Sequence, residues 1–286
     1  MKIKLKRQIN RGIAGNIMVY VVLALVGAFL ALPLIYALAS SIKPYEEIFV
    51  FPPKFYAVHP TLDNFRDLFF LCSNSLVPFT RYLFNSVLVS LIVTVGHIFL
   101  ASMAAYPLAK NEFVGRDTIF SLILAALLFV PQVTFLPQYI IMAKLNLLDT
   151  MWAVIVPNLG SSLGLFLMKQ FMEQIPTSII EAPRIDGASE FKIVFRIVLP
   201  NVKPAWLTLG IFTFQTIWNG TGQNIIFSEQ KKLLPAMLAQ ITSENQIARM
   251  GVGMAATVFL MIPPIIFFII SQSKVIKTMA FAGIKE

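Results

Sequence analysis

Long apolar segments alternate with shorter polar segments along this chain. Six segments are apolar enough over about 20 residues to cross a lipid bilayer as helices. They comprise residues 17–40, 85–108, 118–138, 151–172, 205–226 and 250–271. The third contains Pro131 and Pro137 and the sixth contains Pro263 and Pro264, which predicts kinks in these two helices. The pattern therefore predicts an all-α, polytopic membrane bundle of about six transmembrane helices.

The composition supports a membrane location. Of the 286 residues, 57% are hydrophobic and 13% are charged, whereas an ordinary soluble domain is about 45–50% apolar and about a quarter charged. The first apolar segment exceeds the length of a signal-peptide core, so we interpret it as a retained span. We expect residues 1–286 to form one membrane domain.

The basic residues predict an orientation. If the N-terminus is cytoplasmic, 15 of the 23 Lys and Arg residues fall in inside segments and the other 8 fall outside. The positive-inside rule then places both termini in the cytoplasm. In this orientation two connections are long enough to be structured, an external one at about 41–84 and a cytoplasmic one at 173–204.

Few residues carry the chemistry of metal or covalent sites. Cys72 is the only cysteine, and the two histidines, His59 and His97, lie far apart in the sequence. The chain has no phosphate-binding glycine-rich motif. We therefore expect no catalytic residue, no metal site, no bound cofactor and no nucleic-acid partner. Cys72 falls in the external connection, where an impermeant maleimide should reach it unless the packing of the loop masks the thiol.

His97 lies near the middle of the second apolar segment. An ionisable group at that depth is a functional candidate, but a neutral imidazole bonded to a neighbouring helix is favoured because the segment contains no acidic partner. No Asp, Glu, Lys or Arg lies at the middle of any of the six segments. This argues against a proton-coupled secondary transporter.

The cytoplasmic connection has a distinct local pattern. Thr177 can cap a first helix, and Gly187 can end it in the left-handed conformation. Ser189 can cap a second helix, which Pro200 would end. One apolar face of that helix would comprise Phe191, Phe195 and Val198. The pattern predicts two short helices at roughly a right angle on the membrane surface, although an amphipathic loop on lipid headgroups fits the same residues.

The same connection resembles the EAA motif of binding-protein-dependent ABC transporter permeases. The matching residues are Glu181, Ala182, Asp186, Gly187, Ala188, Leu199 and Pro200. Pro183 departs from the motif, which usually has alanine there, and a proline inside a helix predicts a kinked or late-starting first helix. The resemblance implies that these residues couple the chain to ATP-binding subunits.

Further segments resemble permeases of the carbohydrate-uptake branch of this family. Within that branch the chain is similar to the second permease subunit of the maltose transporter. These segments comprise residues 41–44, 52–53, 60–65, 81–86, 105–109, 145–150, 152–153 and 282–285. The resemblance implies a sugar permease in the bacterial cell membrane, surrounded by lipid. Its implied partners are a second permease subunit, two ATP-binding subunits that use ATP and Mg, and an extracytoplasmic solute-binding protein.

Five residues in the apolar segments are candidates for the substrate pathway: Gln132, Asn158, Gln215, Trp218 and Asn219. Sugars are bound through hydroxyl hydrogen bonds and aromatic faces, and the adjacent Trp218 and Asn219 offer both. Polar contacts between helices are the alternative for each, and Trp218 also suits a position at the membrane interface. For the whole chain, a non-transport membrane scaffold and a secondary transporter remain the alternatives.

Overall fold

The computed structural model describes residues 13–74, 77–222, 225–243 and 249–282, and these residues are helical or irregular, without a strand. The helices of more than ten residues are α1 (Ile13–Ser41), α3 (Asp63–Ser73), α4 (Phe79–Lys110), α5 (Arg116–Ala126), α6 (Pro131–Lys144), α8 (Ser162–Glu173), α12 (Lys203–Asn219) and α14 (Met250–Ala282). The shorter ones are α2 (Tyr45–Ile48), α7 (Trp152–Asn158), α9 (Ser178–Ile185), α10 (Glu190–Ile193), α11 (Leu199–Asn201) and α13 (Leu234–Ser243), with a π-helix η1 (Val194–Val198) and a 3₁₀-helix η2 (Glu229–Lys231). The expected all-α fold is confirmed, while the basic residues before position 12 and most of the 282–285 match lie outside the described residues.

The helices that could cross a membrane can be compared with the six expected spans. Four helical segments are long and apolar enough to cross a membrane: Gly15–Ser41, Phe79–Lys110, Trp152–Glu173 and Met250–Gln272. Two more candidates are bent pairs, α5 with α6 at 106° and Glu190–Asn201 with α12 at 86°. The described residues therefore hold four spans, or up to six when each bent pair is one span.

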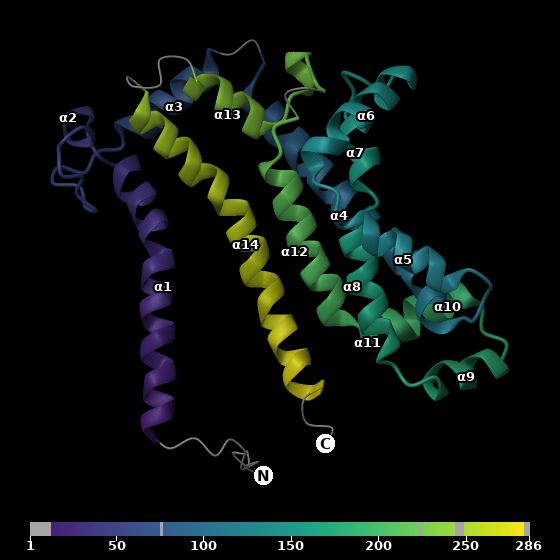
Figure 1. The fold of residues 1–286 in the computed structure, drawn as a ribbon. Coiled ribbons are helices and arrows are strands. Elements are labelled where there is room, and N and C mark those ends of the chain that lie inside the picture. Colours follow the sequence, from purple (N-terminus) through teal and green to yellow (C-terminus); the bar gives the residue numbers. More distant parts are fainter. Residues whose placement is uncertain (1–12, 75–76, 223–224, 244–248, 283–286) are drawn as a thin grey trace. The chain divides into compact units, whose positions relative to one another are not determined.

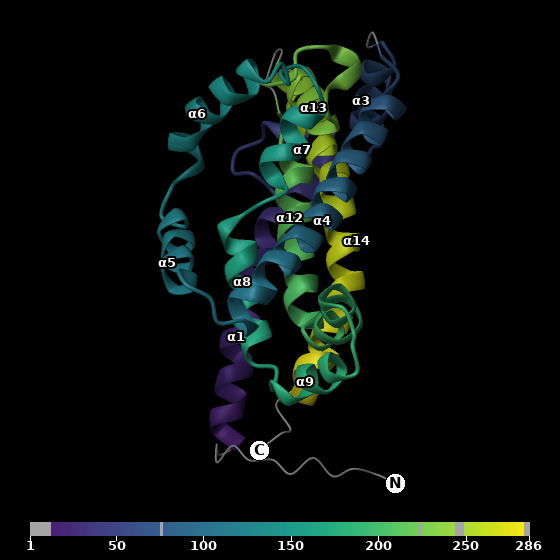
Figure 2. The ribbon, with the colours of Figure 1, turned by 90° about the vertical axis from the view of Figure 1, so that its right-hand side faces the viewer.

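The third expected span, 118–138, is wrong as a single helix. α5 ends at Ala126 and α6 begins at Pro131 beyond the bend, which Figure 2 shows. Pro131 has no N–H to donate, and Val130 before it is extended with ψ 136. The proline therefore starts a new helix where the sequence pattern suggested a kink.

The fifth and sixth expected spans differ from the prediction at their ends. The fifth, expected over 205–226, ends at Asn219 because the chain turns at Gly220 and then takes a positive φ of 60° at Gly222. The sixth begins at Met250 as expected, and α14 runs through Pro263 and Pro264 to Ala282.

The chain forms two compact units, residues 1–69 with 245–258 and residues 70–244 with 259–286. In the first unit the segment after α1 is folded, as its length suggested. The Glu47 carboxylate accepts hydrogen bonds from the backbone N–H groups of Val58 and His59, both at 2.8 Å, and contacts His59 Nδ1 at 2.9 Å. The hydrogen bond from Val58 is the main cause that lowers the pKa of Glu47.

In the second unit, α4 packs against α7, α8, α12 and α13. Two groups of buried apolar side chains lie along it. One joins α4, α8 and α12 to the 173–204 connection and includes Ala105, Met168, Ile193, Val198 and Leu209. The other joins α4 to α7, α12 and the segment after it and includes Val89, Val93, Val154, Ile217 and Ile226. Helix α4 thus packs along both groups, with α7, α8 and α12 beside it (Figures 1 and 2).

Cys72 in α3 is buried, with 1% of its surface exposed, and its Sγ lies 4.0 Å from Met237 Sδ. Burial raises the pKa of the thiol to about 11. Packing therefore masks the thiol that the sequence placed in an accessible loop.

Cys72 should react slowly with a membrane-impermeant maleimide at about pH 7.5, because the thiolate is the reactive form and little of it is present that far below the pKa. The matched reporter is Ser73→Cys in a Cys72→Ala background, since Ser73 is exposed. We expect the reporter to be labelled at least about tenfold faster, and unfolding in detergent to remove the difference. Equal labelling rates in intact cells would show that Cys72 is accessible.

Candidate functional site

The first helix of the 173–204 connection ends in a Schellman turn. Gly187 has a φ of +77°, and its N–H donates to the carbonyl of Arg184 at 3.1 Å. The N–H of Ala188 donates to the carbonyl of Pro183 at 3.0 Å. No atom would lie within 4 Å of a Cβ at Gly187, so the glycine is required by the backbone conformation and not by crowding. The predicted positive φ at this position is confirmed.

Two further expectations for α9 are corrected. The helix does not start late because of Pro183: it begins at Ser178, and Pro183 lies in its last turn, where its carbonyl accepts the bond from Ala188. Thr177 occupies the N-cap position, but its side chain makes no capping hydrogen bond and its backbone is helical, with φ −60° and ψ −31°. A side-chain cap requires the extended conformation there.

The second helical run begins as predicted but ends later. The Ser189 hydroxyl accepts a hydrogen bond from the N–H three residues on, at 3.4 Å, and so caps α10. The run then continues through η1 and α11 to Asn201, so Pro200 does not end it. In the π turn the N–H of Leu199 donates to Val194, five residues back. The wider turn accommodates Pro200, whose ring would clash with the carbonyl four residues earlier in a regular α-helix.

The π turn also changes which side chains face the bundle. The deepest contacts come from Ile193, Val194 and Val198, each 1% exposed or less. Phe191 is 54% exposed, and its ring lies against Phe195 with centroids 4.4 Å apart. The expected apolar face of Phe191, Phe195 and Val198 is therefore correct for Val198 and wrong for Phe191, because the extra residue in the turn rotates the helix face.

Three polar side chains join both helices of the connection to α4. The Glu190 carboxylate accepts hydrogen bonds from the Tyr106 hydroxyl at 2.8 Å and from Arg184 Nε at 2.9 Å. Arg184 Nη2 also donates to the Tyr106 oxygen at 3.2 Å. Lys110, at the end of α4, donates to the carbonyl of Glu173 at 3.2 Å. Sequence analysis missed this network, although Tyr106 belongs to the matched segment 105–109.

The residues predicted to couple the chain to a partner lie on the surface of the connection. Glu181, Ala182, Asp186, Gly187 and Pro200 are exposed, while Ala188 and Leu199 are half-buried. Ile185, which the motif did not mark, is 86% exposed on α9. The connection is thus fixed on one side and presents apolar and acidic groups on the other.

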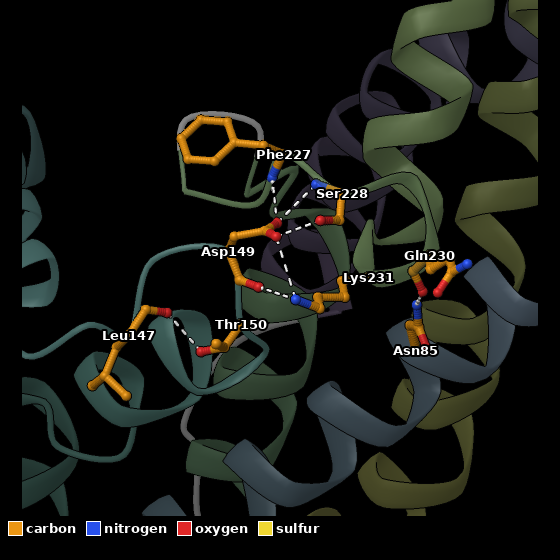
Figure 3. A network of polar contacts seen from close by, with 8 residues as sticks. All are labelled: Asn85, Leu147, Asp149, Thr150, Phe227, Ser228, Gln230 and Lys231. Carbon is orange, nitrogen blue, oxygen red and sulfur yellow. Dashed lines mark hydrogen bonds and ion pairs between the residues drawn. The ribbon is translucent and has the colours of Figure 1, made fainter.

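A second polar network lies at the opposite end of α4 and centres on Asp149 (Figure 3). Its carboxylate accepts hydrogen bonds from the N–H groups of Phe227 at 2.9 Å and Ser228 at 2.7 Å, and from the Ser228 hydroxyl. Lys231 Nζ donates to the Asp149 carbonyl at 2.7 Å. The bonds from Ser228 are the main cause that holds the pKa of Asp149 well below its usual range. This network joins the turn at 145–150 to the segment after α12.

That segment is also bound directly to α4. The Tyr82 hydroxyl donates to Glu229 at 3.0 Å, and Asn85 Nδ2 donates to the carbonyl of Gln230 at 2.9 Å. The Ser86 hydroxyl accepts the N–H of Leu234 at 2.7 Å. Tyr82, Asn85 and Ser86 all lie in the matched segment 81–86, whose polar residues thus have a structural role.

The five candidate pathway residues do not converge on one site. Asn158, at the end of α7, lines a cavity of about 220 Å³ together with Gln138 of α6 and Thr216 of α12. Trp218 is 1% exposed, and its Nε1 donates to the carbonyl of Leu260 at 3.0 Å. The remaining three, Gln132, Gln215 and Asn219, are exposed on α6 and α12. Gln138 and Thr216 were not among the expected candidates, although they are polar residues in the same apolar segments.

No group of three or more His, Cys, Asp or Glu side chains in the described ranges is placed to hold a metal ion. The chemistry available at both ends of α4 is hydrogen bonding between loops and helices.

Comparison with known proteins identifies relatives along most of the chain. Residues 18–280 match the family described as "Binding-protein-dependent transport system inner membrane component". Protein LplC of Bacillus subtilis is 32% identical over 224 residues, which cover 76% of this chain and 72% of LplC. The polygalacturonan/rhamnogalacturonan transport system permease protein YtcP of the same species is 30% identical over 251 residues, which cover 83% of each chain.

A solved structure shares the fold. It is a bacterial ABC transporter involved in the import of the acidic polysaccharide alginate. The matching chain has a TM-score of 0.75 at 22% identity, and the match covers 93% of this chain and 99% of that chain.

Replacing Asp149 by Asn should lower the free energy of unfolding by roughly 1–3 kcal/mol at pH 7, because several hydrogen bonds to a charged acceptor are weakened. The pKa of Asp149 is lower in the folded than in the unfolded chain. Its carboxylate therefore contributes fully to the free energy of unfolding at a pH above the unfolded pKa, and this contribution is lost as the pH falls below about 4 toward the folded pKa. Thermal unfolding in detergent at a series of pH values measures the difference from wild type, with the exposed Asp67→Asn on α3 as the control. A difference that is the same at pH 7 and at pH 3 would contradict this assignment.

Proposed function

Because this chain belongs to the family of binding-protein-dependent transport system inner membrane components, we propose that it is the permease subunit of an ABC importer for a sugar or oligosaccharide. The relatives named for the transport of polygalacturonan and alginate support a carbohydrate as the solute. The observation that carries the proposal is the 173–204 connection, whose helices are held to α4, α8 and α12 while the motif residues of α9 are exposed.

In this proposal the chain is a non-catalytic subunit. A second permease subunit completes the pathway, two ATP-binding subunits hydrolyse ATP with Mg, and an extracytoplasmic solute-binding protein delivers the solute. Glu181, Ala182 and Ile185 lie at helical spacing on the exposed side of α9 and form the surface for an ATP-binding subunit. Asp186, Gly187 and Ala188 set the turn to the second helical run.

The network of Tyr106, Arg184 and Glu190 would transmit a displacement of α9 to the membrane helices. It joins α9 and α10 to α4, and the buried cluster of Ile193, Val194 and Val198 joins the same run to α8 and α12. Leu199 and Pro200 lie at the end of that run, just before the 86° bend to α12. A displacement of the ATP-binding subunits would therefore shift three helices of the bundle together.

The orientation that fits this function places both termini and the 173–204 connection in the cytoplasm, as the distribution of Lys and Arg predicts. The Asp149 network then lies on the outer side. The segment 225–243, held there by Asp149 and Asn85, is in position to meet the solute-binding protein.

The cavity at Asn158 is the part of this subunit best suited to touch the solute. Its polar groups are two amides and a hydroxyl, from Gln138, Asn158 and Thr216, and none of its described lining residues is charged. Amide and hydroxyl groups both donate and accept hydrogen bonds, so they can pair with sugar hydroxyls. The exposed Gln132, Gln215 and Asn219 remain further pathway candidates, and the buried Trp218 would act through helix packing.

Gly187→Val tests the coupling role. A β-branched residue is strongly disfavoured at a φ of +77°, so the turn between α9 and α10 should change while the membrane spans still insert. We expect normal membrane abundance, with ATP-dependent uptake reduced by about tenfold or more, as for loss of a typical coupling free energy.

Gly187→Asn is the matched control, because Asn adopts the left-handed conformation more easily. It should keep most of the uptake. Uptake and solute-stimulated ATP hydrolysis are measured in the same membranes. Wild-type values of both in Gly187→Val, at equal abundance, would show that the connection does not couple the chain to its partners.

Asn158→Leu and Gln138→Leu test the cavity. Each removes hydrogen-bonding groups from the cavity wall, so the maximal uptake rate should fall while the ATPase remains stimulated by the loaded binding protein. Gln132→Leu makes the same change on α6 outside the cavity and should have a smaller effect. A larger loss in Gln132→Leu than in Gln138→Leu would place the pathway on the other side of α6.

A further inference from the structure

The span Trp152–Glu173 is interrupted near its middle. α7 ends at Asn158 and α8 begins at Ser162, and residues 159–161 form a joint between them, here called the α7–α8 joint. Ser161 is extended, with φ −134° and ψ 142°. A break inside an apolar segment leaves N–H groups at the start of the next helix that lipid cannot satisfy. The surrounding side chains must therefore complete the joint.

His97 of α4 is the side chain that reaches the joint. The Ser161 hydroxyl accepts the N–H of Gly164 at 3.0 Å and lies 3.1 Å from His97 Nε2. The other ring nitrogen, Nδ1, lies 2.9 Å from the Thr213 hydroxyl on α12. A neutral imidazole has one donor and one acceptor, so it can complete both hydrogen bonds without a charge. His97 is 3% exposed and thus links α4, the start of α8 and α12 inside the second unit.

The backbone of α8 is shaped around this ring. A Cβ at Gly164 would overlap His97 Nε2, so the imidazole can lie over the first turn of α8 only because residue 164 is glycine. A cavity of about 290 Å³ adjoins the joint and is lined by His97, Gly160, Ser161 and Ser162 among others. The joint therefore has space on one side and a hydrogen-bonded contact on the other.

The two helices that meet at the joint belong to different packing groups. Met168 and Met172 of α8 pack with the buried side chains of the 173–204 connection. Val154 and Ile155 of α7 pack with Val89 and Ile217 in the other group. Asn158, the last residue of α7, lines the candidate solute cavity. A shift of α8 is carried along this span to α7 and Asn158 if the joint does not bend.

We propose that His97 is a positioning residue that holds the α7–α8 joint at a fixed angle. His97 contacts the Ser161 hydroxyl and the Thr213 hydroxyl of α12 at the same time. It thereby transmits a displacement of α8 to α7 and to Asn158. Without it, residues 159–161 flex and absorb the displacement. This inference rests on the proposed function for its role in transport, whereas the fixed angle of the joint does not depend on it.

The first experiment measures coupling in liposomes that contain the complete transporter. For His97→Ala we expect normal assembly and solute-stimulated ATP hydrolysis, but about tenfold less solute imported per ATP, the size of a typical coupling free energy. His97→Gln should retain most of the import, because an amide also has a donor and an acceptor. Ser162→Ala, which removes a neighbouring hydroxyl from the cavity wall, should leave the ratio unchanged.

The second experiment measures the joint without transport. Spin labels at Val156→Cys on α7 and Gln170→Cys on α8, in a Cys72→Ser background, report the distance across the joint. We expect one narrow distribution when residue 97 is the native histidine and also in His97→Gln. The distribution should be broad in His97→Ala and in Gly164→Ala, where the added methyl displaces the ring.

The outcomes separate the two claims. A narrow distribution in His97→Ala overturns the proposed role at the joint, whatever the uptake. A broad distribution with an unchanged import-to-ATP ratio overturns the role in coupling. If the wild-type transporter imports no sugar, the proposed function fails, and the distance measurement still decides whether His97 holds the joint.

Discussion

The second unit depends on the hydrogen bonds that hold the two ends of α4 to segments distant in the sequence. At one end Tyr106 binds Glu190, 84 residues later. At the other end Asn85 binds the carbonyl of Gln230, 145 residues later. These polar groups lie near the ends of a long apolar helix, where an unpaired polar group would be costly to bury. The helices α7, α8 and α12 are then positioned by their packing along the same helix.

The cost of an unpaired polar group also explains where the helices break. Pro131 starts α6 after a bend, Ser161 caps α8 after the α7–α8 joint, and Gly187 ends α9. Each break occurs at a residue that removes a donor, supplies a side-chain acceptor or adopts a positive φ. At these three positions the residue type reduces the number of backbone groups that the break leaves unpaired. Irregular backbone therefore occurs where nearby residues can pair its N–H and C=O groups. These are also the places where two helices can change their relative angle.

The functional interpretation follows from this arrangement. The 173–204 connection is fixed to α4, α8 and α12 on its buried side, and its exposed side carries Glu181 and Ile185. In the proposed function an ATP-binding subunit contacts this exposed side, and the packing on the buried side joins the connection to the bundle. His97 lies on that route, between the helix that contacts the connection and the helix that lines the cavity at Asn158.

Local sequence patterns predicted the features that depend on neighbouring residues. The apolar segments predicted the helical membrane fold, Gly187 predicted the end of α9, and Ser189 predicted the start of α10. Each of these depends on the conformation of a few adjacent residues and on their period. At Pro131 the sequence predicted a kink, whereas the structure has a bend of 106° between two helices. The proline alone does not determine the backbone angles of the residues before it.

The tertiary structure decided the features that depend on residues far apart in the chain. Cys72 is buried in contact with Met237, and Asp149 is structural because its turn meets Phe227 and Ser228. His97 has two hydroxyl partners, 64 and 116 residues away. No period or motif records such contacts, since they arise only when helices pack side by side. The sequence by itself determined the helical membrane fold and the turns at Gly187 and Ser189, and only the packing decided which polar groups meet, because a hydrogen bond requires two atoms at a fixed distance in space.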